Sequence, residues 1–285
     1  MLFQKAHGTG NDFIVLPDPE GEVSLTEGLV RRLCHRRFGI GADGVLRVVR
    51  TASAGEAVPD SEGCQFFMDY RNADGSLAQM CGNGARVFAQ YLWDAGLEPA
   101  GEIRFATRGG ARQATRTTDG LVRVEMGEAA LGPVGAVQVS VAQRSWPATA
   151  VHVPNPHAVA FVDDLADAGA LTDAPGVAPQ GQYPDGANVE FVVVLDEGRI
   201  AMRVHERGVG ETLSCGTGAC AAAVAHLAAA GASGASGASQ AEVRVDVPGG
   251  TVRVTVRGDG TVALTGPVET VAVGRLAQHW LDADS

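Results

Sequence analysis

The sequence predicts an α/β (α+β) fold of two similar domains, each with a sheet curled around a central helix. Three observations support this prediction. Short valine-rich runs bounded by glycine, proline and aspartate recur along the 285 residues, as is typical of β-strands. One helical stretch is almost entirely apolar, as helices buried on every side usually are. A Cys-Gly motif that leads into a helix occurs twice, once in each half of the chain.

The predicted strands are short, and several are joined by tight turns. The pairs Asp119-Gly120, Gly249-Gly250 and Asp259-Gly260 each separate two valine-rich runs, and such two-residue links are typical of β-hairpins. Examples of the expected strands are residues 65–70, 102–107, 121–126, 189–195, 199–205, 242–247 and 251–256.

Helical periodicity is confined to residues 26–37, about 84–95 and about 218–230. Within the third stretch, residues 219–225 read Ala-Cys-Ala-Ala-Ala-Val-Ala, which predicts a helix with no solvent-exposed face. The helix at 84–95 is the candidate for the same role in the other half. Residues 51–63 and the Gly/Ala/Ser run 231–239 are interpreted as loops.

The two halves repeat one motif. Residues 80–85 read Met-Cys-Gly-Asn-Gly-Ala and residues 214–219 read Ser-Cys-Gly-Thr-Gly-Ala, and each precedes a predicted helix. Cys81 and Cys215 therefore stand at equivalent positions, about half a chain apart. We expect one domain at residues 1–118, completed by 267–285, and the other at 119–266.

Composition and charge narrow the range of partners. The net charge of −11 argues against nucleic acid or an anionic membrane as partner. The sequence has neither an apolar run of 18 residues nor a signal-like N-terminus, so we expect no membrane association. Five cysteines, an odd number, are typical of free thiols in a cytoplasmic protein. A small molecule is the expected partner.

A cysteine at a helix N-terminus is suited to acid–base chemistry. Unpaired backbone N–H groups and the positive end of the helix dipole bind anions and lower a thiol pKa. Gly82 and Gly216 leave room for a substrate carboxylate, and Asn83 and Thr217 offer additional donors. Two such sulfurs on opposite faces of one carbon could invert its configuration, one thiolate removing the α-proton and one thiol returning another.

The sequence predicts that this inversion needs no cofactor or metal. A pyridoxal mechanism requires a lysine, and the single lysine, Lys5, lies in a predicted strand without a phosphate-binding context. Cys215 and Cys220 have no matching Cys/His pair nearby, which argues against zinc. The carbanion would then be stabilised by fixed N–H donors and by exclusion of water.

The motifs together resemble those of diaminopimelate epimerase. The most specific matches are residues 206–220, Glu-Arg-Gly-Val-Gly-Glu-Thr-Leu-Ser-Cys-Gly-Thr-Gly-Ala-Cys, and residues 80–86, Met-Cys-Gly-Asn-Gly-Ala-Arg. Further matching stretches occur at 5–13, 39–46, 72–85, 155–161, 188–191 and 248–250. The resemblance implies mixed sheets and interconversion of LL- and meso-2,6-diaminopimelate in lysine and peptidoglycan precursor synthesis. A homodimer is also expected.

The resemblance also implies roles for individual residues. Cys81 and Cys215 would be the acid–base pair, and His157 and Glu206 would assist the two thiols. The substrate would be held by Asn11, Asn72, Gly82, Asn83, Asn155, Asn188, Arg207, Gly216 and Thr217. Departures from the pattern occur at Gly44, where some members carry a substrate-contacting Gln, and at Arg71 and Leu77.

Three alternative functions are weighed against this one. Proline and hydroxyproline racemases also pair two cysteines, but Asn83 and the Glu206-Arg207 pair argue against them. A non-catalytic binding protein on the same scaffold would not need both cysteines. A thiol redox protein would need two cysteines in one short loop, and none of the five forms Cys-x-x-Cys.

Overall fold

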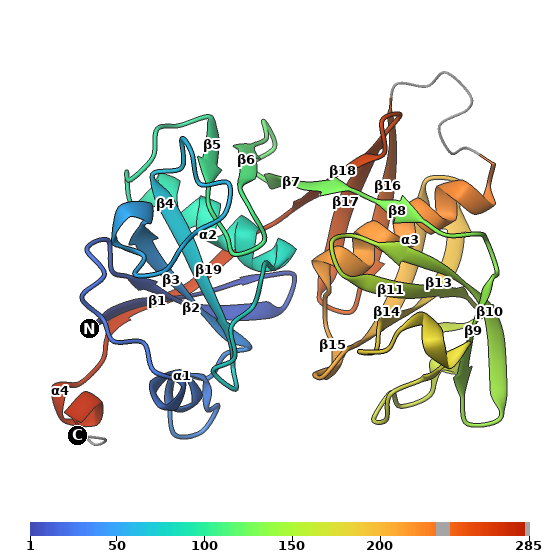
Figure 1. Ribbon diagram of the computed structural model, residues 1–285, viewed down its shortest axis with the longest axis horizontal. Helices are drawn as coiled ribbons and strands as arrows, with labels where there is room; N and C mark the ends of the chain where they lie inside the picture. Colours follow the sequence, from blue (N-terminus) through green and yellow to red (C-terminus); the bar gives the residue numbers. More distant parts are fainter. Residues whose placement is uncertain (232–239, 283–285) are drawn as a thin grey trace. The chain divides into compact units, whose positions relative to one another are not determined.

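The computed structural model describes residues 1–231 and 240–282. The chain forms two compact units, Met1–Val124 with Pro267–Ser285, and Glu125–Gly266 (Figure 1). Residues 232–239 of the predicted Gly/Ala/Ser loop lie outside the described residues. In the described part of the chain, none of the helices is both long enough and apolar enough to cross a membrane.

The first unit combines a five-stranded sheet, a central helix and a short pair of strands. The sheet has the order β19-β1-β2-β3-β4. The elements are β1 (Leu2–Gly8), β2 (Asn11–Pro17), α1 (Glu27–Cys34), β3 (Gly44–Arg50), a 3₁₀ turn (Thr51–Ser53), β4 (Phe66–Asn72), α2 (Gly82–Asp94), β5 (Glu102–Phe105), β6 (Arg112–Arg116), β19 (Glu269–Arg275) and α4 (Gln278–Leu281).

Helix α2 packs on this sheet, and a glycine allows the close approach. A Cβ built at Gly84 would lie 3.3 Å from Leu46 Cδ2 and 3.5 Å from Phe13 Cε1. Leu46 and Phe13 are fully buried. The first turn of α2 therefore rests directly on strands β2 and β3, so the beginning of the helix is fixed at one end of the sheet.

The second unit is a larger sheet built around one helix. Its strands follow the order β12-β9-β10-β11-β13-β14-β16-β17-β18, followed by β7. The elements are β7 (Val122–Glu128), β8 (Ala130–Leu131), β9 (Val137–Val141), β10 (Arg144–His152), β11 (Pro156–Phe161), a 3₁₀ turn (Leu165–Ala168), β12 (Gly176–Ala178), a second 3₁₀ turn (Gln180–Gln182), β13 (Asn188–Asp196), β14 (Arg199–Glu206), β15 (Gly210–Thr212), α3 (Gly216–Ala229), β16 (Gln240–Val247), β17 (Gly250–Arg257) and β18 (Thr261–Gly266).

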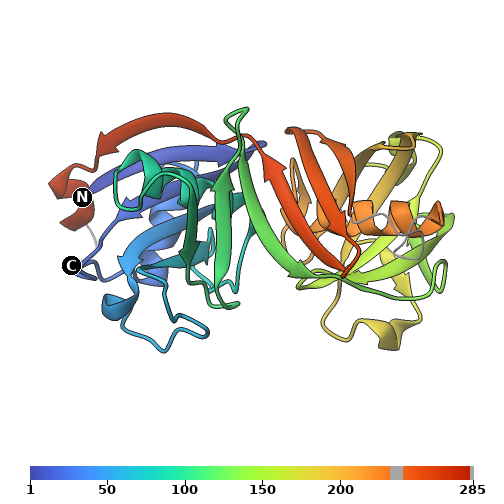
Figure 2. The same ribbon diagram turned by 90° about the horizontal axis from the view of Figure 1, so that it is seen from above.

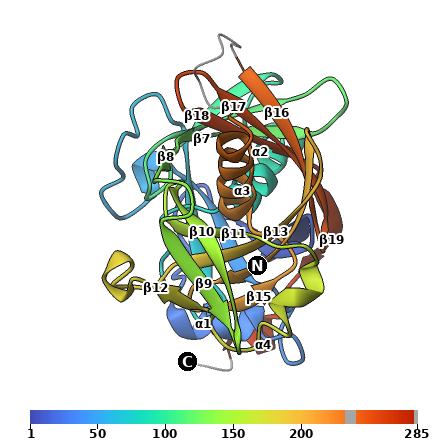
Figure 3. The same cartoon turned by 90° about the vertical axis from the view of Figure 1, so that its right-hand side faces the viewer.

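Strands enclose α3 on all sides. Every residue from Gly216 to Leu227 is buried, as the apolar sequence of this stretch predicts. Figure 3 shows α3 with β10, β11 and β13 below it and β16 to β18 above it. From above, the orange helix runs between the red strands and the yellow and green strands of its unit (Figure 2). The predicted sheet curled around a central helix is confirmed.

The two units share one pairing pattern. In the first, β1 and β2 are antiparallel, β2 and β3 parallel, and β3 and β4 antiparallel. In the second, β10 and β11 are antiparallel, β11 and β13 parallel, and β13 and β14 antiparallel. A helix that begins just after a cysteine follows each pattern. Both sheets are therefore mixed, and the predicted similarity of the two halves extends to their strand order.

The seven predicted strands and three predicted helices are all present, with ends shifted by up to three residues. Helices α2 and α3 begin two residues earlier than predicted, because Cys81 and Cys215 cap them. The three predicted hairpin turns join β6 to β7, β16 to β17 and β17 to β18. Cys64 lies in the loop just before β4.

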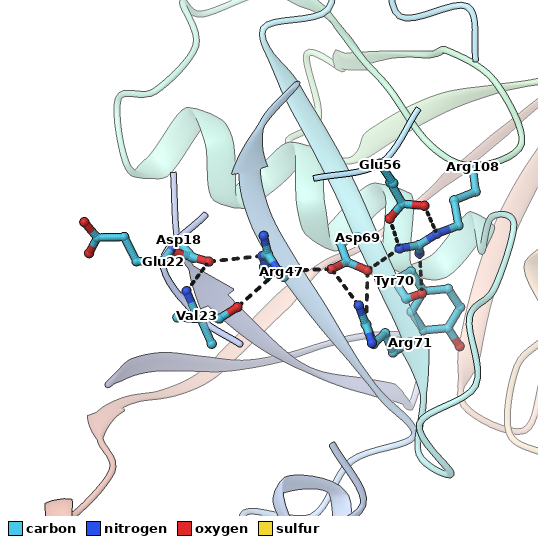
Figure 4. Close-up of polar contacts among 9 residues, drawn as sticks. All are labelled: Asp18, Glu22, Val23, Arg47, Glu56, Asp69, Tyr70, Arg71 and Arg108. Carbon is cyan, nitrogen blue, oxygen red and sulfur yellow. Dashed lines mark hydrogen bonds and ion pairs between the residues drawn. The ribbon is translucent and has the colours of Figure 1, made fainter. Parts of the chain in front are cut away.

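A buried cluster of charged residues lies beside β3 and β4, in the first unit (Figure 4). The Asp69 carboxylate faces the guanidinium groups of Arg108 at 2.6 Å, Arg71 at 3.3 Å and Arg47 at 3.7 Å. Arg108 also donates to Glu56, in the loop at 51–63, at 2.5 Å. The cluster therefore attaches this loop to the sheet.

We expect Asp69→Asn to destabilise the protein by about 3–5 kcal/mol. Asp69 is 3% exposed, so its loss leaves buried guanidinium groups without their shared anion. The free energy of unfolding in urea is the measurement. Glu20→Gln is the matched control, since Glu20 pairs with Arg50 at 3.4 Å with both side chains exposed, and should change stability by less than about 1 kcal/mol. Equal losses in the two variants would contradict the expectation.

Candidate active site

Cys81 caps the N-terminus of α2. Its backbone is extended, with φ −140° and ψ 124°, and its sulfur accepts a hydrogen bond from the Gly84 N–H at 3.4 Å. This is the geometry of an N-cap side chain, which satisfies a backbone donor that the helix leaves unpaired. The side chain of Cys81 is only partly buried. The sulfur of Cys81 thus stands at the positive end of α2, as the motif predicts.

Asn11 lies against this sulfur, and its orientation is fixed. The Asn11 amide nitrogen donates to Asp43 Oδ2 at 2.9 Å. Because a carboxylate only accepts hydrogen bonds, the Asn11 oxygen must point the other way, and it lies 3.6 Å from Cys81 Sγ. Asp43 is itself held by Arg36 at 2.7 Å. Asn11 therefore accepts the thiol hydrogen of Cys81 and cannot donate to the sulfur.

Asn83, in the first turn of α2, joins the same group. Its amide nitrogen donates to Asn11 Oδ1 at 3.2 Å, and its oxygen accepts from Arg86 Nη2 at 2.7 Å. Arg86 is fully buried and also donates to Thr9 Oγ1 at 3.3 Å. The buried guanidinium orients Asn83, so the side chains of Asn83 and Asn11 are held in fixed orientations beside Cys81.

Asn72 and Gly44 pair at the ends of β4 and β3. The Asn72 amide donates to Ser76 Oγ at 3.0 Å. A Cβ at Gly44 would lie 2.6 Å from the Arg71 carbonyl oxygen and 2.7 Å from Tyr70 Cε2. The Arg71 backbone and the Tyr70 ring therefore leave no room at position 44 for a longer side chain such as Gln.

The side chain of Lys5 forms an ion pair and a hydrogen bond to the backbone. Its ammonium group pairs with Asp12 Oδ2 at 2.5 Å and also donates to the Gly41 carbonyl oxygen. Asp12 in turn pairs with Arg36 at 2.9 Å, and these cations hold the pKa of Asp12 well below its usual range against the opposing effect of burial. The single lysine is thus part of an ion-pair group around the β1–β2 hairpin.

Cys215 caps α3 in the same way as Cys81 caps α2. Its sulfur accepts the Gly218 N–H at 3.4 Å and lies 3.4 Å from Thr217 Oγ1. Burial, together with the carboxylates of Glu206 and Glu190, raises the pKa of Cys215 well above its usual value. The expected lowering of this pKa by the helix N-terminus is therefore wrong for Cys215, because burial and two nearby carboxylates outweigh one helix end.

Glu206 is the acceptor for the Cys215 thiol. It is the last residue of β14, and its carboxylate is hydrogen-bonded by Cys215 and by Thr212 Oγ1, the latter at 2.5 Å. Burial raises the pKa of Glu206, and the charge of Glu190 raises it further. A carboxylate of raised pKa in contact with a thiol is suited to take and return that thiol's proton.

His157 is fully buried between two side chains. Its Nδ1 lies 2.7 Å from Glu190 Oε1, and its Nε2 lies 2.8 Å from Asn155 Oδ1. His157 and Glu190 are both inaccessible to solvent. The Tyr183 hydroxyl donates to the His157 carbonyl oxygen at 3.0 Å. The imidazole is thus fixed at the ring and at the backbone.

Asn188 ties three segments of the second unit together. Its amide donates to the Pro156 carbonyl oxygen at 3.3 Å, and its oxygen accepts the Arg207 N–H at 3.0 Å. The Arg207 guanidinium touches the carbonyl oxygens of Asp185 and Gly186, each at 3.4 Å. Asn188 therefore fixes the backbone at Arg207, the residue that follows the end of β14.

The structure gathers the residues singled out by sequence into one group in each unit. The first holds Cys81, Gly82, Asn83 and Asn11, while Asn72, at the end of β4, has Ser76 as its side-chain partner. The second holds Cys215, Gly216, Thr217, Glu206, His157, Asn155, Asn188 and Arg207.

Three residues of these groups, Asp43, Thr212 and Glu190, are not among those predicted from the sequence. A signal for Glu190 existed, since it is the one charged residue in the apolar run 189–194. Such a residue in a buried strand needs a partner. Asp43 and Thr212 stood in turn-like contexts, where nothing in the sequence set them apart.

Comparison with known proteins agrees with this geometry. The family model described as "Diaminopimelate epimerase" matches residues 3–132 and 149–271. A diaminopimelate epimerase of Streptomyces coelicolor is 52% identical over 282 residues, covering 99% of this chain and 97% of that protein.

Two solved structures share the fold. A Bacillus anthracis phenazine biosynthesis protein of the PhzF family superimposes with a TM-score of 0.68 at 15% identity, covering 97% of this chain and 99% of that one. A probable proline racemase from Agrobacterium radiobacter gives 0.67 at 17%, covering 99% and 94%. The match of the family model over most of the sequence shows that this chain belongs to the diaminopimelate epimerase family.

Proposed function

We propose that this protein interconverts LL- and meso-2,6-diaminopimelate by moving one α-proton, with Cys81 and Cys215 as the acid–base pair and without a cofactor. The observation that carries the proposal is the repeated placement of a cysteine as the N-cap of a buried central helix. The full-length similarity to diaminopimelate epimerases supports the choice of substrate. The product serves lysine and peptidoglycan precursor synthesis.

The proton transfers balance without an added reagent. One sulfur, as thiolate, forms an S–H bond as the substrate Cα–H bond breaks, and the electron pair remains on the carbon. The opposite thiol gives its proton to the other face of that carbon and becomes a thiolate. The configuration is inverted, and the two sulfurs have exchanged protonation states, so the reverse reaction uses the same groups in opposite roles.

Glu206 and His157 are proposed as the groups that reset these protonation states. Glu206 contacts the Cys215 thiol, so it takes the proton of Cys215 when that sulfur must act as base. His157, the imidazole of the same buried cluster, is proposed as the second proton carrier.

The substrate carboxylate at the reacting carbon is proposed to bind at the helix N-termini. Gly82 and Gly216 begin α2 and α3, and backbone N–H groups there bind anions. Asn83 and Thr217 add donors beside them. Asn11, Asn72, Asn155, Asn188 and Arg207 are proposed to hold the remaining amino and carboxylate groups, of which diaminopimelate has two each.

The cellular setting is also proposed. All five cysteines are free thiols, which suits the reducing cytoplasm. We further propose that two copies form a homodimer. Strand β19 stands at the edge of the five-stranded sheet, with Val271 60% and Val273 73% exposed, and an apolar edge of this kind is usually covered by a partner. Sedimentation equilibrium tests the dimer.

We expect the purified, reduced protein to convert LL-diaminopimelate to the meso isomer with no added cofactor. The rate should be unchanged by dialysis against a chelator and by omission of pyridoxal phosphate, because the two thiols supply the chemistry. Chiral chromatography of the reaction measures conversion, with L-proline and trans-4-hydroxy-L-proline as alternative substrates. Faster inversion of either proline, or a requirement for pyridoxal phosphate or a metal, would contradict the proposal.

A further inference from the structure

We propose that Glu190 is the positioning residue of the site: it holds the His157 ring with a proton on Nδ1, so that Nε2 is the nitrogen that exchanges protons. This inference rests on the proposed function for its catalytic meaning. Its structural part concerns the ring alone. Glu190 is the third residue of β13, two residues after Asn188.

The contact is short and excludes water. Glu190 Oε1 lies 2.7 Å from His157 Nδ1, and neither side chain is accessible to solvent. A carboxylate accepts hydrogen bonds and does not donate them, so Nδ1 must carry the hydrogen. The second ring nitrogen, Nε2, lies 2.8 Å from Asn155 Oδ1, an oxygen that can only accept, so Nε2 donates to it; this partner is neutral and substrate binding can displace it. Only Nε2 is left free to change its partner.

The surrounding chain is shaped to admit this carboxylate. A Cβ at Gly218 would lie 2.8 Å from Glu190 Oε1, so a side chain there would push Glu190 away from its position. Gly218 is in the first turn of α3, where the helix dipole favours a negative charge. The second glycine of the Cys-Gly-Thr-Gly motif therefore has a role toward Glu190 in addition to its N–H bond to Cys215.

Stability alone does not account for Glu190. Among the described residues, its second oxygen, Oε2, is buried without a hydrogen-bond partner in the protein. Buried ion pairs are often no more stabilising than apolar residues of similar volume. A buried carboxylate with one unsatisfied oxygen therefore lowers the stability of the folded protein. Such a cost is expected where the side chain serves to position a neighbouring group.

Several charged or titratable groups surround the pair. Glu206 and Cys215 lie close enough to Glu190 to be influenced by its charge. Burial raises the pKa of both groups, and Glu190 raises each of them further. Burial and Glu190 together raise the pKa of Tyr183 to about 12, so its hydroxyl keeps its hydrogen and its bond to the His157 backbone. Glu190 thus lies beside Glu206, Cys215 and Tyr183, and it influences each of them.

The test is Glu190→Gln, which keeps the size of the side chain and removes its charge. A Gln amide can donate to Nδ1 as well as accept from it, so the tautomer is no longer imposed. Two-bond ¹H–¹⁵N correlation spectra of ¹⁵N-histidine protein report which ring nitrogen carries hydrogen. We expect a protonated Nδ1 in His157 of the native protein and its loss in the variant. His226, whose Nε2 bonds the Glu197 carbonyl oxygen at 2.9 Å, is the internal control.

The same variant is then assayed for epimerisation. We expect kcat to fall about 10–100-fold, the range typical of groups that orient a working histidine, with KM changed less than about threefold. Glu211→Gln is the matched control, since Glu211 pairs with Arg203 at 2.6 Å outside this cluster, and it should keep both the spectrum and the kinetics.

The outcomes separate this inference from the proposed function. An unchanged His157 spectrum in Glu190→Gln overturns the positioning role, whatever the protein's substrate is. A changed spectrum with kcat unchanged overturns the catalytic part of the inference. A native protein that shows the expected His157 tautomer but does not epimerise diaminopimelate overturns the proposed function and leaves the positioning role in place.

Discussion

Replacing Cys81 or Cys215 with alanine is expected to reduce inversion of diaminopimelate more than about 10³-fold, because each variant lacks one of the two groups that move the proton. The loss should be the same for either cysteine in the net reaction. Exchange of the α-hydrogen with solvent can persist for one stereoisomer, since the remaining sulfur still faces one side of the carbon. Chiral chromatography measures inversion, and mass spectrometry in deuterated water measures exchange.

Cys220→Ala is the control for these two variants. Cys220 lies five residues beyond Cys215 in α3 and is fully buried. Its replacement should lower stability by about 1 kcal/mol and leave turnover intact. Inversion at near the native rate in Cys81→Ala or Cys215→Ala would show that the two-cysteine mechanism is wrong. Loss of activity in a folded Cys220→Ala variant would show that loss of activity on removing a thiol does not by itself identify a catalytic cysteine.

Glu206→Gln is expected to lower kcat about 10²-fold or more, because the amide can hydrogen-bond Cys215 but cannot accept its proton. The substitution keeps the size of the side chain and its possible contact with Thr212. Glu206→Asp, which keeps the carboxylate but withdraws it from Cys215, should retain more activity than Glu206→Gln. Steady-state kinetics of the three proteins make the comparison. Activity of Glu206→Gln within threefold of native would exclude Glu206 as the proton acceptor.

The pH dependence of kcat/KM tests whether Glu206 acts in its ionised form. Glu206 must be ionised to accept a proton, so activity falls as pH decreases through its pKa. Burial raises that pKa, which places the acid limb of kcat/KM above the ordinary Glu value of about 4.3. In Glu206→Asp the pKa that sets this acid limb should change, since the shorter side chain places the carboxylate in different surroundings. A limb that is identical in both proteins would belong to another group.

Much of the fold follows from local sequence signals. The apolar stretch at 219–225 is buried throughout in α3, because a helix without a polar face has no stable place at the surface. The Asp-Gly and Gly-Gly pairs gave the hairpins, since glycine enters the left-handed conformations that these turns need: Gly120 has φ 80°, Gly250 has φ 140° and Gly260 has φ 85°. The helix starts were displaced because a cysteine is an unusual N-cap.

The protonation chemistry could not be predicted in the same way. A helix N-terminus predicts a lowered thiol pKa, yet the pKa of Cys215 is raised, because burial and the nearness of Glu190 depend on tertiary packing. Asp43 fixes the orientation of Asn11 across 32 residues of sequence, and His157 meets Glu190 across 33. Such pairs arise from adjacent strands, and neither partner indicates the other in the sequence.

The central claim, that one sulfur removes the proton and the other delivers a new one, is tested most directly by the first turnovers of LL-diaminopimelate in deuterated water. Thiol hydrogens exchange with the solvent before reaction, so the delivering sulfur carries deuterium. We expect the meso product to hold deuterium at the inverted carbon while the unreacted LL isomer remains unlabelled. A product that keeps the original hydrogen, or label that enters the recovered LL isomer as fast as product forms, would contradict the account.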